Sequence, residues 1–351
     1  MGKEIKKRTF TRGEKLSLTW FLLFSGAALA AQAITLFGQE PQAHPERAFL
    51  PPFTSVAHLL GTDHLGRDLL FYLLLSCRTA WLLAIPPLSL ATLLGVVAGT
   101  SAAILGNSGL KVSLWKILVL LFLGFLYFYF KGAVNWAITT YSLSYLRYGY
   151  EGVLVFLLFL LWGMKVPKGL KRGKNEVAIP IEGALLKIIN IWSTLPKLLL
   201  LLILSAFTPF SLYSLMGWIC VTYWVLPARI ARASVLQLKE ETYYEATRAL
   251  GIPFRKVFVQ FLWPSIKGPI LTNFCFAASG LLGIGSTLAY LGIGIPADVP
   301  SWGKLLANAR YSYEAWWIFL FPAITLLFSI LSLQTLGNRF SARSTQASVT
   351  K

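Results

Sequence analysis

The most informative polar side chains of the sequence stand in one short segment, residues 240–264, between two long apolar stretches. It reads EETYYEATRALGIPFRKVFVQFLWP, and its fixed points are Glu245, Ala246, Gly251 and Pro264. Residues 243–250 are expected to be helical, because the glycine and proline directly after them end a helix. A second short amphipathic helix would end at Pro264. The segment predicts a knob that docks onto a partner, although its composition alone also fits an ordinary structured loop.

Another polar group reads GTDHLGRD at residues 61–68, between the first two apolar stretches. Asp63, Arg67 and Asp68 could form a local salt-bridged helix start, since an acidic side chain stabilises the first turn of a helix. A functional role at the outer surface is the alternative, and both interpretations stay open. The residues concerned are Gly61, Thr62, Asp63, Gly66, Arg67 and Asp68.

The histidine and cysteine residues show no recognisable metal-ligand spacing. His58 and His64 have no third ligand at a usable distance along the chain. Cys77, Cys220 and Cys275 lie far apart, with no paired spacing. The sequence therefore predicts neither a metal site nor a disulfide framework.

Lys197 is the one basic residue that lies inside a predicted apolar span and outside the inner segments given below, and it follows Pro196 directly. A charge at the centre of a bilayer costs about 2.5–3.5 kcal/mol on insertion scales. Its side chain should therefore face protein or water, or extend toward the interface. One interpretation is a paired or extended lysine, and the other is a place on a substrate path where it contacts a carboxylate.

The composition requires a membrane protein. Of 351 residues, 56% are hydrophobic and 13% are charged, with a mean hydropathy of +0.64, which a soluble core could not accommodate. The apolar runs are continuous over about 20 residues, as helical spans are, whereas a membrane barrel would alternate. We predict an all-α, polytopic fold with eight spans, at 16–37, 79–105, 114–130, 152–164, 185–207, 212–228, 269–295 and 315–337.

The positive charge is distributed unevenly along the chain. The net charge of +18 would suggest nucleic acid in a soluble protein, but its position matters more here. With a cytoplasmic N-terminus, 24 of the 32 Lys and Arg residues fall on the inner side. This bias predicts cytoplasmic termini, and the basic runs are expected to contact anionic lipid, not nucleic acid. The inner segments are 1–15, 106–116, 165–187, 229–267 and 338–351.

The charged segment resembles the EAA loop of ATP-binding-cassette (ABC) importer permeases. That loop carries Glu-Ala-Ala, three residues, Gly and a downstream Pro, matched here by Glu245, Ala246, Gly251 and Pro264. Thr247 replaces the second Ala, which is a small change. Trp263 precedes the Pro, where the family usually has a run similar to His-Ile-Leu, and it would alter the docking surface.

Two further motifs are similar to those of the dipeptide, oligopeptide and nickel group of these permeases. GTDHLGRD resembles the outer signature of the group. PSWG at 300–303, with AWW at 315–317 and FP at 321–322, resembles the end of its second-type membrane subunit. The resemblance covers about 58–105 and 180–340. Asn190 stands where the family typically has Asp.

The resemblance implies a core of six spans with about two inserted transmembrane helices at 114–164. The expected organisation is an N-terminal tail, first helix and outer loop (1–57), an outer motif with the second helix (58–105), an inserted hairpin with a basic linker (106–179), a permease core with a coupling loop at 229–267 (180–340), and a C-terminal tail (341–351).

The function implied is that of a non-catalytic permease subunit of an ABC importer for peptides or a related small solute, in the bacterial inner membrane. Its expected partners are a homologous second permease, ABC ATPase subunits, an extracytoplasmic substrate-binding protein and membrane lipid. Residues 169–174 lack the order of a phosphate-binding loop, so ATP and Mg²⁺ would be held by the ATPase and no cofactor by this chain. The rival hypothesis is a transport-inactive membrane scaffold or sensor that keeps the permease fold.

Overall fold

The computed structural model describes residues 10–38, 43–54, 58–107, 111–113, 176–178, 180–206, 211–296 and 298–349. The chain divides into a first unit, Met1–Ala103 with Leu185–Lys351, and a second unit, Ile104–Ala184. The predicted spans 114–130 and 152–164 and the basic linker after them lie outside the described residues.

The regular secondary structure of the described residues is helical, apart from one pair of short strands and an isolated bridge between Thr62 and Asp68. Its helices are α1 (Arg12–Leu36), η1 (Pro45–Arg47), α2 (Leu69–Leu105), α5 (Ile181–Thr194), α6 (Lys197–Ala206), α7 (Leu212–Tyr223), α8 (Val225–Glu240), α9 (Thr242–Ala249), α10 (Phe254–Val257), the π-helix η3 (Phe258–Leu262), α11 (Trp263–Tyr290), α12 (Trp302–Asn308), η4 (Ala309–Tyr311) and α13 (Trp316–Val349). In the second unit, β1 (Lys111–Ser113) pairs antiparallel with β2 (Glu176–Ala178), and Val112 lies opposite Val177.

Five helical stretches are long and apolar enough to cross a membrane: Arg12–Leu36, Leu69–Leu105, Leu212–Glu240, Phe258–Tyr290 and Trp316–Ala342. They confirm the prediction of a helical, multi-pass fold. The predicted span 185–207 differs, because two shorter helices, α5 and α6, replace it. The break falls at Leu195 and Pro196, where proline removes a backbone donor and restricts the residue before it.

Helix α2 begins at Leu69, ten residues before the predicted start at Thr79. Arg78, assigned from the sequence to the outer loop, therefore lies inside the helix, where its Nε donates to Gln32 Oε1 of α1 at 2.5 Å. Helix α1 likewise begins at Arg12 instead of residue 16, so Glu14 lies in its first turn and forms a capping box with Thr11.

The long helices also run further than predicted at the end of the bundle that carries α9. Helix α8 continues to Glu240 although its span was expected to end at residue 228. The reason is an amphipathic stripe, since buried residues recur at helical spacing along its length. These residues are Ala228, Ala231, Val235 and Leu238.

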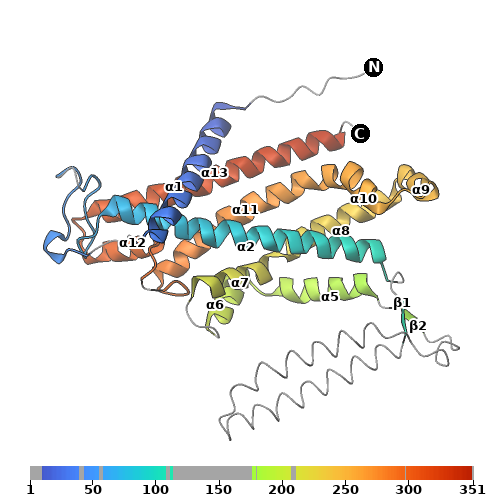
Figure 1. Cartoon of the computed structure of the whole chain (residues 1–351), viewed down its shortest axis with the longest axis horizontal. Helices are drawn as coiled ribbons and strands as arrows, with labels where there is room; N and C mark the ends of the chain where they lie inside the picture. The colour runs from blue at the N-terminus through green and yellow to red at the C-terminus, as the bar shows by residue number, and fades with distance from the viewer. Residues whose placement is uncertain are drawn as a thin grey trace, which may run out of the picture. The chain divides into compact units, whose positions relative to one another are not determined.

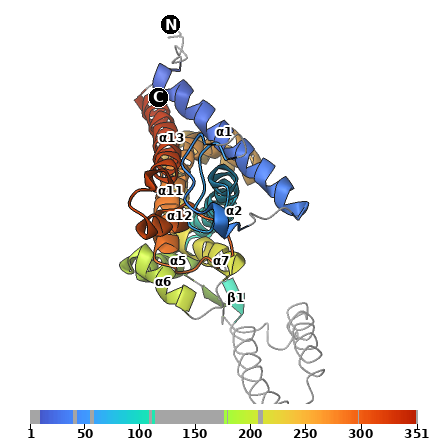
Figure 2. The same cartoon turned by 90° about the vertical axis from the view of Figure 1, so that its left-hand side faces the viewer.

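Helix packing in the first unit brings α11 along α13, while α1 crosses the outside of α13 and α2 (Figures 1 and 2). Two glycines of α2 allow a close contact with the start of α8. A Cβ atom on Gly95 would lie 2.3 Å from Trp224 O, and one on Gly99 would lie 2.2 Å from Ala228 O. Helices α2 and α8 therefore approach as closely as glycine permits.

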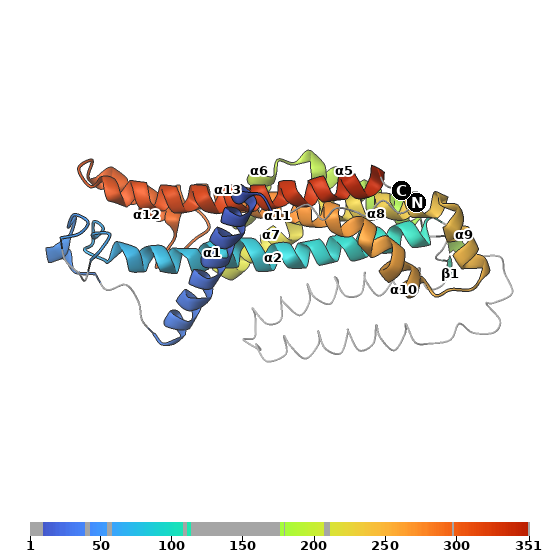
Figure 3. The same ribbon diagram turned by 90° about the horizontal axis from the view of Figure 1, so that it is seen from above.

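Different segments of the chain lie at the two ends of this unit. Figures 1 and 3 show α12 and the 43–68 segment at one end, and α9 with the C-terminal end of α13 at the other. The membrane-spanning helices and the broken pair α5 and α6 run between these ends. The two polar motifs of the sequence therefore lie at opposite ends of one bundle.

Candidate functional site

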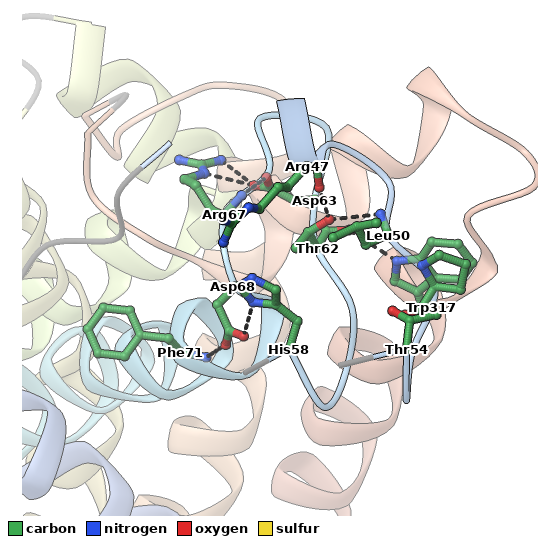
Figure 4. Close-up of polar contacts among 11 residues, drawn as sticks. Arg47, Leu50, Thr54, His58, Thr62, Asp63, Arg67, Asp68, Phe71 and Trp317 are labelled. Atoms are coloured by element: carbon green, nitrogen blue, oxygen red, sulfur yellow. Dashed lines mark hydrogen bonds and ion pairs between the residues drawn. The ribbon is translucent and has the colours of Figure 1, made fainter. Parts of the chain in front are cut away.

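The outer motif folds into a closed polar network around Asp63 (Figure 4). Asp63 is completely buried. Its Oδ1 accepts hydrogen bonds from the backbone N–H groups of Leu65, at 2.9 Å, and Arg67, at 3.0 Å. Its Oδ2 accepts from Arg67 Nε at 2.8 Å and lies 2.7 Å from Arg67 Nη2. The carboxylate is thus satisfied entirely within the loop.

Thr62 joins this loop to the segment before it and to α13. Its hydroxyl donates to Arg47 O at 2.5 Å and accepts from the N–H of Leu50 at 2.9 Å. Its carbonyl accepts from Trp317 Nε1 at 3.1 Å. Three stretches of chain that are distant in sequence therefore meet at one buried threonine (Figure 4).

Glycine is required at two positions of the motif. Gly61 and Gly66 have φ angles of +80° and +72°, which side chains rarely adopt. A Cβ atom on Gly61 would lie 2.4 Å from Leu50 O, and one on Gly66 would lie 1.8 Å from His44 O. Both glycines allow a close approach of backbone to backbone.

Asp68 and the neighbouring histidines complete this end of the bundle. Asp68 Oδ1 accepts from the N–H of Phe71 at 2.8 Å and so caps α2, while Oδ2 lies 2.9 Å from His58 Nδ1. His64 stacks on Tyr311 with ring centroids 5.0 Å apart, and burial lowers its pKa. Among the described residues no group of three His, Cys, Asp or Glu side chains could hold a metal ion.

Lys304 is a polar residue of this end that the sequence reasoning missed. Its Nζ donates to the carbonyls of Pro296 and Val299, the latter at 2.7 Å, and burial lowers its pKa to about 8. It follows the PSWG motif, in which Ser301 caps α12 and Trp302 is fully buried. The only feature of the sequence that could have singled out Lys304 was its position directly after the PSWG motif.

At the opposite end, the segment 240–264 begins with the predicted helix. The structure has it as α9, Thr242–Ala249, within one residue of the predicted 243–250. Gly251 follows with a φ of +67°, and the N–H of Ile252 donates to Thr247 O at 3.0 Å. The glycine therefore ends the helix in a left-handed conformation, as expected.

The second predicted helix does not end at Pro264. Helix α10, the π-helix η3 and α11 follow one another without a break, and Pro264 lies in the first turn of α11. The N–H of Trp263 bonds to Phe258 O, five residues earlier. Pro264 has no N–H to donate, and the wider π turn directly before it lets the helix continue into the span.

The side chains of α9 face in two directions. Glu245 and Ala246 are exposed, whereas Thr247 is buried and its hydroxyl donates to Tyr244 O at 2.7 Å. Large apolar side chains are also exposed elsewhere in the 240–264 segment, namely Leu250 at 77%, Val259 at 58% and Trp263 at 45%. Thr247, the departure from the EAA pattern, therefore points away from the exposed face.

The base of α9 is fixed to the bundle. Lys239, next to the last residue of α8, donates from Nζ to Ala103 O near the end of α2, at 2.6 Å. Tyr243 of α9 packs on Phe261 of η3 with ring centroids 5.1 Å apart. Helix α9 is thus connected to α8 on one side and to α11, through η3, on the other.

Lys197 lies apart from both ends. It begins α6, and its Nζ lies 4.7 Å from the centroid of the Tyr223 ring, in the range of a cation–π contact. Both residues line a pocket of about 350 Å³ between α5, α6, α7, α8 and α11. None of the predicted outer-motif or coupling residues lines it.

Comparison with known proteins agrees with this geometry. Residues 180–346 match the family of the binding-protein-dependent transport system inner membrane component. A putative peptide transport system permease protein of Brucella suis is 33% identical over 155 residues, which are 44% of this chain and 52% of that protein. The chain thus spans about half the length of the first curated relatives it matches.

Two oligopeptide transport system permease proteins, both OppC, extend the comparison. That of Bacillus subtilis is 27% identical over 53% of this chain and 59% of its own length. That of Lactococcus lactis subsp. cremoris is 22% identical over 86% of this chain and 80% of its own length. The predicted resemblance to peptide transport permeases is confirmed, and residues 180–346 of this multi-pass membrane chain match the family of binding-protein-dependent transport system inner membrane components.

Proposed function

We propose that the chain is the permease subunit of an ATP-driven ABC importer for peptides or a related small solute. The observation that carries the proposal is the family match over 180–346, which includes the whole of α9 and the spans on both sides of it. The relatives are named as peptide transport permeases, and this supports a peptide substrate.

Coupling to ATP hydrolysis would pass through α9. Its exposed Glu245 and Ala246 are suited to docking on an ATPase subunit, and the same segment exposes the apolar side chains of Leu250, Val259 and Trp263. Because α9 is attached to both α8 and α11, a displacement of α9 would tilt two spans together. ATP and Mg²⁺ would be held by the ATPase.

The remaining partners follow from this arrangement. A homologous second permease would complete the translocation path, and an extracytoplasmic binding protein would deliver substrate at the end that carries α12. Both termini and α9 would be cytoplasmic, which agrees with the clustering of Lys and Arg in the inner segments. The basic residues there would contact anionic lipid.

The test is a mild-detergent purification of the tagged chain, with mass spectrometry of the proteins that co-purify. We expect an ATPase and a second permease with the wild type, and loss of the ATPase alone with Glu245→Ala. Glu314→Ala is the matched control, because Glu314 is also exposed but precedes α13 at the opposite end. Absence of any ATPase from a folded wild-type sample would favour the transport-inactive scaffold instead.

A further inference from the structure

The pocket beside Lys197 lies part-way along the spans of the first unit, and the side chains of Lys197 and Arg229 are accessible in it. Tyr223, on its wall, follows the start of α7 by eleven residues, a rise of roughly 17 Å along the helix. Asn273, on another wall, follows the start of α11 by ten residues, or roughly 15 Å. The pocket therefore opens among the spans and not at either polar end of the bundle.

Two cations share this pocket. Lys197 and Arg229 both line it, and no Asp or Glu is among its described lining residues. Arg229 Nη2 donates to Ser193 Oγ at 2.9 Å and lies 3.5 Å from Asn190 Oδ1. These two partners are neutral, so they orient the guanidinium without cancelling its charge. Neither cation has an acidic partner in the pocket, so an anion bound there would be attracted by both.

A third hydrogen-bond donor in the pocket is the indole of Trp192. The indole Nε1 of Trp192, another lining residue, is buried and has no acceptor among the described residues. An indole N–H only donates, as do the lysine and arginine head groups. The pocket thus gathers donors from α5, α6 and α8, and the complementary group is an anionic acceptor with more than one oxygen.

We propose that this pocket, formed by Lys197, Arg229 and Trp192, binds a carboxylate of the transported solute. The inference rests on the proposed peptide import. Every unmodified peptide has a carboxylate at its C-terminus, and the Tyr223 ring beside Lys197 gives the pocket an apolar wall that suits the adjacent side chain. The phosphate of an anionic lipid has similar charge, and it is treated as an alternative outcome of the test.

The experiment measures equilibrium binding to the purified complex in phosphatidylcholine nanodiscs, without the extracytoplasmic binding protein. The two probes are radiolabelled trialanine and its C-terminal amide, which differ in one carboxylate. We expect the acid to bind about tenfold more tightly than the amide, the effect of a charge-assisted hydrogen bond. ATP-dependent uptake of trialanine by proteoliposomes containing the complex and its binding protein tests the proposed function separately.

Three variants and one control sharpen the measurement. Lys197→Met removes the charge and Lys197→Arg keeps it, so the preference for the acid should fall to about twofold or less in the first and survive in the second. Asn190→Asp places a carboxylate beside Arg229 at ion-pair distance, and it should also reduce the preference. Lys187→Met is the control, because Lys187 is exposed on α5 and does not line the pocket.

Each outcome decides between the hypotheses. The pocket assignment would be overturned if the complex takes up trialanine but binds the acid and the amide equally well. It would also be overturned if the preference for the acid is unchanged in Lys197→Met and Asn190→Asp. In both cases the proposed function would stand. Absence of any uptake would overturn the peptide function, and the pocket assignment with it. Phosphatidylglycerol that co-purifies with the wild type but not with Lys197→Met, with the peptide preference unchanged, would assign the pocket to lipid.

Discussion

The outer motif at 61–68 and the coupling segment at 240–264 look alike as sequence, since each is a short polar run with fixed glycines and acidic residues between apolar spans. The structure separates them. Asp63 and Thr62 are fully buried and bond within the protein, whereas Glu245 and Ala246 face outward. A motif can thus hold the fold together or present a surface, and the burial of its side chains distinguishes the two.

The first prediction removes the centre of the outer network. Asp63→Ala leaves Arg67 without its buried partner, and loss of one member of a buried ion pair costs about 3–5 kcal/mol. We expect a large fall in melting temperature or in the yield of folded protein, measured by fluorescence-detected size exclusion after heating. A melting curve like that of the exposed-site variant Glu314→Ala would contradict a structural role.

The second prediction compares one glycine from each region. Gly66 and Gly251 have φ angles of +72° and +67°, so alanine strains both by about 1–2 kcal/mol. Only Gly66 is also crowded, because a Cβ atom there would lie 1.8 Å from His44 O, while one on Gly251 would have nothing within 4 Å. Gly66→Ala should therefore lower the melting temperature clearly more than Gly251→Ala, and equal shifts would contradict the difference in packing.

The third prediction concerns the inward face of α9. Thr247→Ala removes the hydrogen bond to Tyr244 O and should cost about 1 kcal/mol. Because Thr247 is buried, recovery of the ATPase with the purified chain should not change. Loss of the ATPase without loss of folded protein would place Thr247 on the docking surface instead.

Much of the fold could be predicted from the sequence, because long apolar runs are a strong local signal of membrane-spanning helices. The helix before Gly251 was predicted to within one residue, since glycine and proline end helices by backbone geometry. The break between α5 and α6 was not predicted, although Pro196 was visible. Hydropathy is averaged over a window longer than such a break, so residues 185–207 look the same whether they form one span or two shorter helices.

The candidate sites were less predictable, because side-chain direction depends on tertiary contacts. Nothing in GTDHLGRD indicates that Thr62 meets Trp317, which lies 255 positions away. The helix continues past Pro264 because of the π turn of η3. The spacing of apolar residues along the sequence does not reveal this π turn. The pocket around Lys197 unites residues from five helices, of which the sequence singled out only the lysine.

The central claim is that the exposed face of α9 contacts an ATPase, and photocrosslinking in intact membranes tests it most directly. A benzoylphenylalanine would replace Ala246 in one variant and Tyr313, which is 95% exposed at the opposite end, in the control. We predict a light-dependent adduct with an ATPase subunit from position 246 and none from position 313. No ATPase adduct at 246 in a folded, membrane-inserted chain would contradict the account.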